Sequence, residues 1–432
     1  MTRKMKDSGI EWIGEIPEDW DVVRNKNIFN RKKEIIENEW KNTQLLSLTT
    51  KGIIKKDISI LEGKLPESFS TYQFVNKGDL VLCLFDLDMS AVFNGYCQYD
   101  GMISPAYKRY VLKAEGDLRY YNYLFDFIFD KRKYKIYSTT LRFTLDNQEF
   151  DRIPTIKPNL KQQIEIANFL DRKTKQIEDI KNTIKNEIEN LENYKKSVIT
   201  ESVTKGLDKN VEMKDSGIEW IGEIPKHWKI IRLKYGLTEK MKYGASEEGV
   251  EFSESLPRYI RITDIDQNGN LKSTGKQSLP ENKSVGYILE DNTVLFARSG
   301  ATVGKTFLYK KEYGRSAYAG YLIAAKTNNI ILLGIWLYYF TFSDAYYNWT
   351  RQMFSQSTIQ NINAEKYSNM PLPITGISNQ LKIIDYLNKK TKLIDDSIAI
   401  KQKQLETLEE YKKSLIYEYV TGKKEVKDGE ET

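Results

Sequence analysis

The stretch MKDSGIEWIGEIP occupies residues 5–17 and recurs letter for letter at residues 213–225. The match continues beyond the identical letters, since Trp20 is repeated as Trp228. A repeat at an interval of 208 residues is typical of a chain built from two related halves. We therefore predict an internal duplication with pseudo-two-fold symmetry.

A second repeat follows at a different interval, 217 residues, where TKQIEDI at 174–180 resembles TKLIDDS at 391–397. Between the repeated parts lie two inserts, 21–158 and 229–375, which scarcely resemble each other. The larger second interval means that the second insert is nine residues longer. A symmetric framework with two unlike inserts suits a protein that reads two unlike half-sites.

Apolar residues recur every seven positions in two long segments without proline, 159–204 and 376–421. Such heptads favour coiled-coil helices, here about 65 Å long each. We expect the two helices to pack on each other antiparallel, because pseudo-two-fold pairing places the inserts at opposite ends. The alternative is that each helix packs only on its own domain. The predicted seam residues are Leu170, Ile177, Ile184, Leu191, Val198, Leu387, Ile394, Leu408 and Leu415.

Two details of these helices go beyond the main series. Ile166, Ile180 and Tyr194 are interpreted as a second row of the first seam. Lys401 interrupts the second series, with Ile398 and Leu405 interpreted as lying off the seam. The second helix is therefore expected to be less regular around Lys401.

The inserts alternate strand-like and turn-like pieces, such as GDLVLCL at 78–84 and NTVLFAR at 292–298. Each then contains an aromatic helical stretch, at 120–129 and 331–349. The predicted fold class is α+β, with two α+β domains separated by two long antiparallel coiled-coil helices. The predicted boundaries are 1–20 (framework), 21–158 (first domain), 159–204 (central helix), 205–228 (repeated framework), 229–375 (second domain), 376–421 (C-terminal helix) and 422–432 (charged tail).

Composition excludes several classes of site. Two cysteines and one histidine, His227, cannot supply the usual ligands of structural zinc, and they suggest no disulfide framework. The longest apolar run, 330–342, is too short to cross a bilayer and is predicted to be a buried helix. We expect a cytoplasmic chain without a secretory leader, metal or cofactor.

The segment ARSGATVGKT at 297–306 is similar to a phosphate-binding loop. However, Gly300 and Gly304 enclose three residues, whereas the nucleotide-binding loop has four. A strand-like FLY follows it in place of a helix, so no helix N-terminus would meet the phosphate. We predict a hairpin turn that touches DNA, with an ATP site as the minor alternative.

Basic residues in the inserts cluster beside Ser, Thr, Tyr and Gly, as is common where a protein meets phosphates and base edges. The net charge of +6 permits such binding without requiring it, and a single cluster is more often a solvated surface. The candidate DNA-binding residues are Lys51, Lys55, Lys56, Tyr107, Lys108, Arg109, Lys131, Arg132, Lys133, Arg142, Arg261, Arg298, Ser299, Lys305, Arg351, Gln352 and Gln356.

Nearly the whole chain resembles the specificity subunits of Type I restriction–modification enzymes. The resemblance rests on SGIEWIGEIPEDW, SGIEWIGEIPKHW, the two helical repeats, GDLVLCL and ARSGATVGKT. It implies two target-recognition domains, each reading one half of a split, asymmetric DNA site. It further implies helices that set the gap between the half-sites, and a framework that docks two methyltransferase (modification) subunits, which restriction subunits then join.

The same resemblance implies a non-catalytic subunit, because methyl transfer and ATP-driven cleavage belong to the partner subunits. Two alternatives stay open at this stage. The chain could be a coiled-coil adaptor whose inserts bind proteins, or a stand-alone DNA-modifying enzyme. Salt-dependent DNA binding would favour the DNA-binding specificity subunit over the adaptor. Turnover by the chain alone would favour the stand-alone enzyme.

Overall fold

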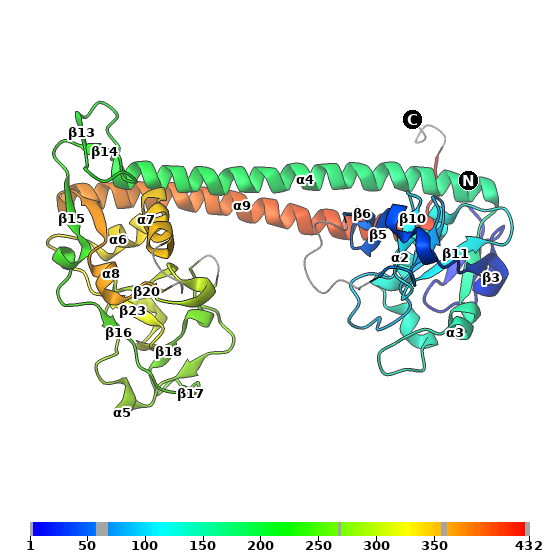
Figure 1. Cartoon of the computed structure of the whole chain (residues 1–432), viewed down its shortest axis with the longest axis horizontal. Coiled ribbons are helices and arrows are strands. Elements are labelled where there is room, and N and C mark those ends of the chain that lie inside the picture. The colour runs from blue at the N-terminus through cyan, green and yellow to red at the C-terminus, as the bar shows by residue number, and fades with distance from the viewer. Residues whose placement is uncertain (1–2, 58–67, 267–268, 356–360, 428–432) are drawn as a thin grey trace. The chain divides into compact units, whose positions relative to one another are not determined.

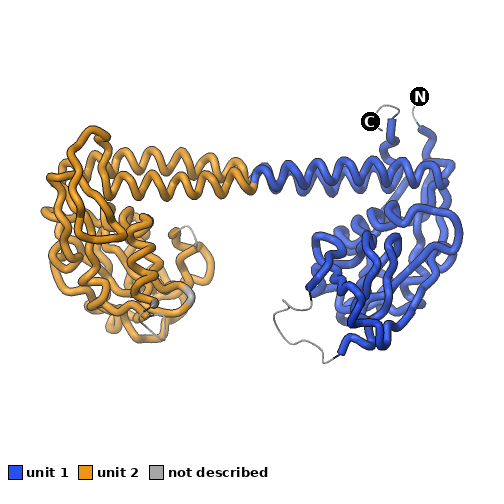
Figure 2. The backbone as a smooth tube through the Cα atoms, turned by 45° about the horizontal axis from the view of Figure 1, so that its top comes forward, with its two compact units in different colours: residues 1–184, 403–432 blue, residues 185–402 orange. Residues whose placement is uncertain are grey.

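The computed structural model describes residues 3–57, 68–266, 269–355 and 361–427. The chain divides into two compact units, 1–184 with 403–432 and 185–402 (Figure 2). Unit 1 contains the first insert and unit 2 the second, and each contains one copy of the repeated framework (Figure 1). None of the described helices is long and apolar enough to cross a membrane.

The repeated stretch forms the same β-hairpin in each unit. In unit 1, β1 (Met5–Asp7) pairs antiparallel with β2 (Glu15–Pro17). In unit 2, β13 (Met213–Asp215) pairs in the same way with β14 (Glu223–Pro225). The identical sequences therefore fold identically.

Each framework ends in a fully buried tryptophan, and the residues just after one of the long helices pack against it. Gly422, just past one helix, approaches Trp20 and Pro17 so closely that an added Cβ would lie 2.5 Å from the Pro17 ring. Gly206, just past the other helix, lies against Trp228 in the same manner. Both glycines have positive φ (71° and 78°), so glycine suits these positions for conformation as well as space.

In unit 1 the insert forms two four-stranded sheets. Leu80 and Leu82 of the strand β8 (Leu80–Leu82) pack toward the helix α2 (Leu118–Asp130), whereas Val81 and the following Cys83 pack toward the second sheet. This period of two places the first sheet in the middle of three layers. The first sheet has the order β4 (Phe29–Lys32), β11 (Lys108–Leu112), β8 (Leu80–Leu82), β9 (Asn94–Tyr96). The second has the order β6 (Gly52–Lys56), β5 (Leu45–Thr49), β10 (Gly101–Ile103), β7 (Gln73–Val75).

Unit 2 repeats this plan with an unrelated sequence. Val294 and Phe296 of β20 pack toward helices, and Leu295 and Ala297 pack toward the second sheet. The first sheet has the order β16 (Lys242–Tyr243), β23 (Leu322–Ala325), β20 (Val294–Ala297), β21 (Thr306–Leu308), which matches unit 1 strand for strand. The second has the order β17 (Val250–Glu251), β19 (Gln277–Ser278), β18 (Arg258–Ile260), β22 (Ser316–Tyr318).

Two short sheets close the inserts. In unit 1, β3 (Asp21–Arg24) pairs with β12 (Pro154–Lys157), and in unit 2, β15 (Lys229–Arg232) pairs with β24 (Pro371–Ile374). Each pair brings the first and last strands of an insert together just before a long helix begins. The shorter helices are α1 (Asn25–Ile28), α2 (Leu118–Asp130), α3 (Asn147–Arg152), α5 (Glu281–Ser284) and α8 (Ala364–Ser368). The 3-10 turns are η1 (Glu37–Asn42), η3 (Lys133–Tyr137), η4 (Leu233–Gly236), η5 (Ile262–Asp264), η6 (Gly300–Thr302) and η7 (Lys311–Tyr313).

The aromatic stretch of the second insert corrects a prediction. We expected one helical stretch over 331–349, but the structure has two helices, α6 (Gly334–Phe340) and α7 (Asp344–Ser355). Ser343 explains the break, because its hydroxyl accepts a hydrogen bond from the Tyr346 amide (3.2 Å) and caps the start of α7. The same hydroxyl donates to the carbonyl of Phe340 at the end of α6 (2.6 Å).

The two long helices are confirmed, as α4 (Leu160–Thr204) and α9 (Ile377–Val420). Within unit 1 they run antiparallel, since Lys181 pairs with Glu409 (2.6 Å) and Glu178 with Lys412 (2.9 Å). Within unit 2 they are also antiparallel, with Lys195 on Asp395 (2.7 Å) and Lys401 on Glu187 (2.5 Å).

Burial along the helices supports the main seam and corrects its second row. All nine predicted seam residues are buried except Leu191 and Leu408, which are half-buried. Ile180 and Tyr194 are 49% and 48% exposed, so their assignment to the seam is wrong. The second row lies four residues after each heptad position, at Thr174, Lys181, Ile188 and Lys195, and in α9 it includes the half-buried Ile398 and Leu405. The residues three and four positions after a heptad position both lie next to it on the helix surface. The contact with the partner helix decides which of the two is buried in the seam.

Candidate functional site

In each first sheet, a turn connects the third strand of the order to the edge strand beside it. In unit 1, β8 and β9 enclose residues 83–93, and in unit 2, β20 and β21 enclose residues 298–305. Because the sheets match in order and direction, these two turns occupy equivalent positions on one fold. Many of the predicted DNA-binding residues lie at or beside them.

In unit 2 the segment ARSGATVGKT forms the predicted hairpin turn. β20 pairs antiparallel with β21, and a strand follows Lys305 in place of a helix. The turn rests on α7, where the Tyr346 hydroxyl donates to the carbonyl of Gly304 (2.8 Å). Arg298, Ser299 and Lys305 therefore lie on a segment in contact with the helix that carries Arg351 and Gln352.

Arg298 is held differently from the candidate arginines Arg109, Arg132, Arg142 and Arg261, whose side chains contact carboxylates or a carbonyl. Its guanidinium lies over the ring of Tyr243, 5.0 Å from the centroid. It makes no hydrogen bond or ion pair through its side chain with any residue that the structure describes. Exposed Lys305 is likewise without an acidic partner in the described part of the chain. Two cations without acidic partners can bind an anion at little cost.

Arg261 lies elsewhere in unit 2 and its donors are occupied. It contacts both carboxylate oxygens of Asp264 (3.1 and 2.7 Å) and donates to Gln277 Oε1 (2.6 Å). These contacts raise its pKa, chiefly through the hydrogen bond to Asp264. Arg261 thus stabilises its own loop, and binding a ligand would require breaking that pair. Gln356 lies outside the described residues.

In unit 1 the equivalent turn is acidic and the nearby cations are paired with it. Lys135 pairs with Asp88 (2.7 Å), and Arg142 lies 3.9 Å from Asp86. Arg132 donates to the carbonyl of Leu87 (3.1 Å). Lys131 and Lys133 flank this arginine after α2, and Lys131 lies 3.9 Å from Asp130. Of the predicted cluster at 131–133, Arg132 therefore contacts the turn and helps to hold it in place.

Arg109 is a structural residue. Its guanidinium pairs with Asp79 at 2.6 Å, and the two side chains are only 6% and 7% exposed. Burial raises the pKa of Asp79, while the main-chain amide of Asn76 and Arg109 favour its charged form. Arg109 also donates to the carbonyl of Phe74 (3.1 Å). Neighbouring Tyr107 is half-buried, with its ring 6.1 Å from that of Phe85.

A row of cations that the sequence analysis missed lies on the edge of the first sheet in unit 1. Arg31 and Lys32 of β4 are exposed, as is the following Lys33, and β11 places Lys108 beside them. Burial and the charges of Arg31 and Lys33 lower the pKa of Lys108. None of these four residues has an acidic partner among the described residues. We call Arg31, Lys32, Lys33 and Lys108 the basic strip; its RKK run was visible in the sequence.

The other unit 1 candidates lie on the second sheet. Lys51 occupies the turn between β5 and β6, while Lys55 and Lys56 belong to β6 itself. Lys55 lies over the ring of Tyr99 at 4.5 Å. These three lysines are exposed and lie on a different sheet from the basic strip and the acidic turn.

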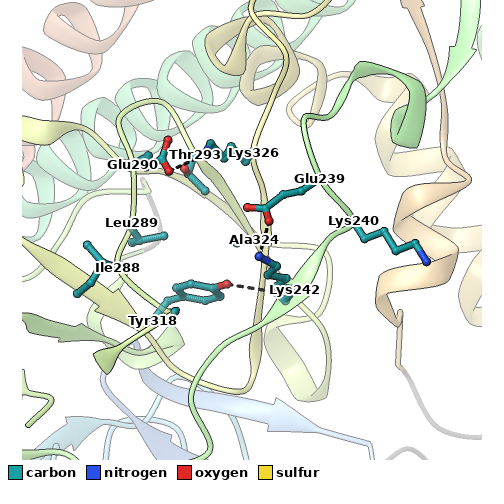
Figure 3. Close-up of a pocket in the computed structure, with 11 residues that line it drawn as sticks. Glu239, Lys240, Lys242, Ile288, Leu289, Glu290, Thr293, Tyr318, Ala324 and Lys326 are labelled. Atoms are coloured by element: carbon teal, nitrogen blue, oxygen red, sulfur yellow. Dashed lines mark hydrogen bonds and ion pairs between the residues drawn. The ribbon is translucent and has the colours of Figure 1, made fainter. Parts of the chain in front are cut away.

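A small pocket in unit 2 offers no comparable site. Figure 3 shows its lining, in which Lys242 pairs with Glu239 and the Tyr318 hydroxyl donates to the carbonyl of Lys242 (3.4 Å). Lys326 at the same pocket pairs with Glu290. Its volume of about 50 Å³ has room for little more than water, and both of its acidic residues, Glu239 and Glu290, are already paired with lysines. Exposed His227 lies on the repeated framework, and no group of His, Cys, Asp and Glu within the described ranges could hold a metal.

Comparison with known proteins gives consistent matches. Residues 225–410 match the family model described as the Type I restriction modification DNA specificity domain. The MjaVIII specificity subunit of a Type I restriction enzyme from Methanocaldococcus jannaschii is 24% identical over 96% of this chain and 95% of its own length. A putative MjaX specificity subunit from the same organism is 23% identical over 96% of each chain.

Solved structures agree on the fold. A chain from a structure described as the basis of complex assembly and conformational transition of the type I R-M system has a TM-score of 0.67. It covers 94% of this chain and 99% of its own, at 14% identity. The HsdS subunit from Thermoanaerobacter tengcongensis has a TM-score of 0.50 at 14% identity, over 96% of this chain and 99% of its own.

Proposed function

Since this chain belongs to the family of Type I restriction–modification specificity subunits, we propose that its two inserts read the two halves of one bipartite, asymmetric DNA site. The chain is the DNA-recognition subunit of such a system and not one of its catalytic subunits. The observation that carries the proposal is one sheet plan with two unlike hairpin turns. The turn of unit 1 contains Asp86 and Asp88, whereas that of unit 2 contains Arg298 and Lys305.

Each insert is proposed to enter the major groove with its hairpin turn and the loops around it. Cations without acidic partners, such as the basic strip and Lys305, would contact phosphates and fix the orientation. Side chains held in a fixed geometry would then meet the base edges. Both inserts must reach one side of the duplex, so the half-site centres are expected about 34 Å apart, one helical turn.

The partners follow from the family. DNA and other subunits of a restriction–modification complex are the partners of this chain. We further propose that the repeated framework docks two modification subunits, since one surface present twice can bind one partner twice, and that restriction subunits then join. A protein-binding adaptor is set aside, because the matching family is a DNA specificity domain. The cytoplasmic location stays a prediction.

Methylation mapping tests this proposal directly. The chain would be co-expressed with the modification subunit of its system, and methylated adenines would be mapped across the host genome. We expect one split motif whose two halves differ in sequence. A palindromic or continuous motif would contradict the assignment of one half-site to each insert. Loss of all methylation on deletion of either insert is the matched control.

The basic strip provides a prediction for phosphate binding. The double variant Arg31→Ala, Lys33→Ala removes two cations and is expected to weaken binding to all DNA sequences alike. The slope of log K against log salt should fall by about 0.9 for each phosphate that the variant no longer neutralises, measured by titration of duplex DNA at several salt concentrations. The control is Lys392→Ala, an exposed lysine paired with Asp396 on α9. An equal change of the salt-dependence slope in both variants would show that the basic strip has no specific role in phosphate binding.

A further inference from the structure

We propose that Arg298 is the side chain with which unit 2 reads a guanine in the major groove. The inference rests on the proposed function and deepens it, because it assigns one base of the second half-site to one residue. Four features carry it: a fixed main chain, a guanidinium that lies over an aromatic ring, side-chain donors without a partner among the described residues, and polar and aromatic neighbours.

The main chain of Arg298 is fixed from both sides. Its amide donates to the carbonyl of Tyr321 (3.1 Å), and its own carbonyl accepts from the amide of Ile362 (2.9 Å). The preceding Ala297 is fully paired in the hairpin, where its carbonyl accepts from Gly304 (3.1 Å). Three segments far apart in the sequence therefore hold the Cα of Arg298 in place, which limits the entropy lost when the side chain binds.

The side chain is oriented as well. The guanidinium lies 5.0 Å from the ring centroid of Tyr243, at a distance typical of a cation–π contact. The Tyr243 hydroxyl accepts a hydrogen bond from the amide of Ala364 (3.1 Å), which fixes the ring in turn. A planar guanidinium on a fixed ring presents its N–H groups in one plane, as bidentate recognition requires.

The donors of Arg298 are nevertheless unused. Its Nε is buried without a hydrogen-bond partner, and no side-chain bond to the described residues 3–57, 68–266, 269–355 and 361–427 satisfies the rest of the fork. By contrast, Arg109 pairs with Asp79 and Arg261 with Asp264. An arginine whose position is fixed while its donors stay free is better explained by a ligand than by the fold.

The surroundings of Arg298 favour a base over a phosphate. Ser299 is bridged through the main chain to Asn361, whose side-chain oxygen is buried without a described partner, so a second polar group is available nearby. Tyr321, which is 66% exposed, adds an aromatic surface next to the arginine. A long exposed lysine such as Lys305 is sufficient to bind a phosphate. A guanidinium held in a fixed orientation is better suited to donate two hydrogen bonds to two acceptors that lie in one plane. In the major groove guanine alone offers such a pair, O6 with N7.

The test uses the assembled complex of this chain with its modification subunit. Duplexes carrying each single base substitution in the methylated motif would compete for binding and methylation. In the wild type, replacing the guanine read by unit 2 should reduce affinity roughly tenfold to 100-fold. In Arg298→Ala that position alone should lose discrimination, while the other half-site keeps its preferences. Arg298→Lys should not restore the preference, because a single ammonium group lacks the fork.

Controls separate this inference from weaker ones. Arg315→Ala removes an exposed arginine of unit 2 whose side chain pairs with Glu281, and it should leave the motif unchanged. Tyr243→Leu should lower base discrimination at the same position that Arg298→Ala affects. Thermal unfolding of Tyr243→Leu, compared with that of Arg298→Lys, shows whether the domain still folds. A uniform loss of affinity with an unchanged motif would make Arg298 a phosphate-binding residue and overturn the assignment, as would an effect at a base other than guanine. Failure of the wild-type complex to bind DNA would instead reject the proposed function itself.

Discussion

Among single residues, Asp126 of α2 gives a prediction about pH. Burial raises its pKa to about 6, although Asn94 donates a hydrogen bond to it and Lys412 attracts its charged form. An acid whose pKa is raised on folding stabilises the fold fully below pH 4, and this contribution is lost as the pH rises through 6. Asp126→Asn should therefore be more stable than the wild type at pH 7 by about 3 kcal/mol, and equally stable near pH 4. Denaturant unfolding at both pH values measures this difference, and parallel pH profiles for the two proteins would contradict it.

The candidate site shows what single residues reveal in a sequence and what they do not. Arg109, Arg261 and Arg298 each follow or belong to a strand and were equally good candidates. Two of them differ in partners that are distant in the sequence, since Asp79 lies thirty residues before Arg109 and Tyr243 lies fifty-five before Arg298. For these two arginines, distant contacts decide whether the side chain is free to bind a ligand. Arg261 is different, because its partner Asp264 lies only three residues further along the chain. The basic strip is the opposite case, because its RKK run is local and could have been found.

At the scale of elements, Lys401 predicts a gain in stability. It occupies a seam position of α9 where the repeat in α4 has the buried Ile184. Its ion pair with Glu187 is partly exposed, and such pairs contribute about 0.5 kcal/mol, whereas a buried isoleucine contributes about 1.5 kcal/mol or more. Lys401→Ile should thus stabilise the helix pair of unit 2 by about 1 kcal/mol. Thermal unfolding followed by helical circular dichroism measures this gain. Lys403→Ile, at a position 77% exposed, is the control, and an equal effect of both changes would contradict the seam assignment.

Elements were predicted well where the pattern is long. Both long helices begin and end within one residue of the expected bounds, because the same apolar position recurs at every second turn along most of their length. The second row of the seam was misplaced since a helix alone does not distinguish +3 from +4 neighbours. The break between α6 and α7 was missed because it depends on the hydroxyl of Ser343 within an otherwise continuous aromatic run.

For the whole chain, the duplication predicted the fold class. It did not predict that the two inserts share the strand order of their first sheets. The inserts scarcely resemble each other in sequence, yet their first sheets have the same strand order and directions. Both inserts share a pattern in which successive buried residues of one strand pack on opposite faces of the first sheet. Leu80 and Val81 show this pattern in unit 1, and Val294 and Leu295 show it in unit 2. Many sequences satisfy such a pattern, so comparing letters could not reveal it. The side chains outside this core are correspondingly free to differ between two reading domains.

The same scale carries a prediction about the recognised gap. Residues 189–195 of α4 face 395–401 of α9 in the register that pairs Lys195 with Asp395, so removing both heptads keeps the seam in phase. At 1.5 Å per residue the helix pair shortens by about 10 Å, equivalent to about three base pairs. If the helices set the spacing, the methylated motif should keep both half-sites and lose about three base pairs between them. Methylation should also slow, since three base pairs turn the half-sites about 100° around the duplex. Replacing the two heptads by others of equal length is the control. A deletion variant that still methylates the original motif would show that the gap is set elsewhere.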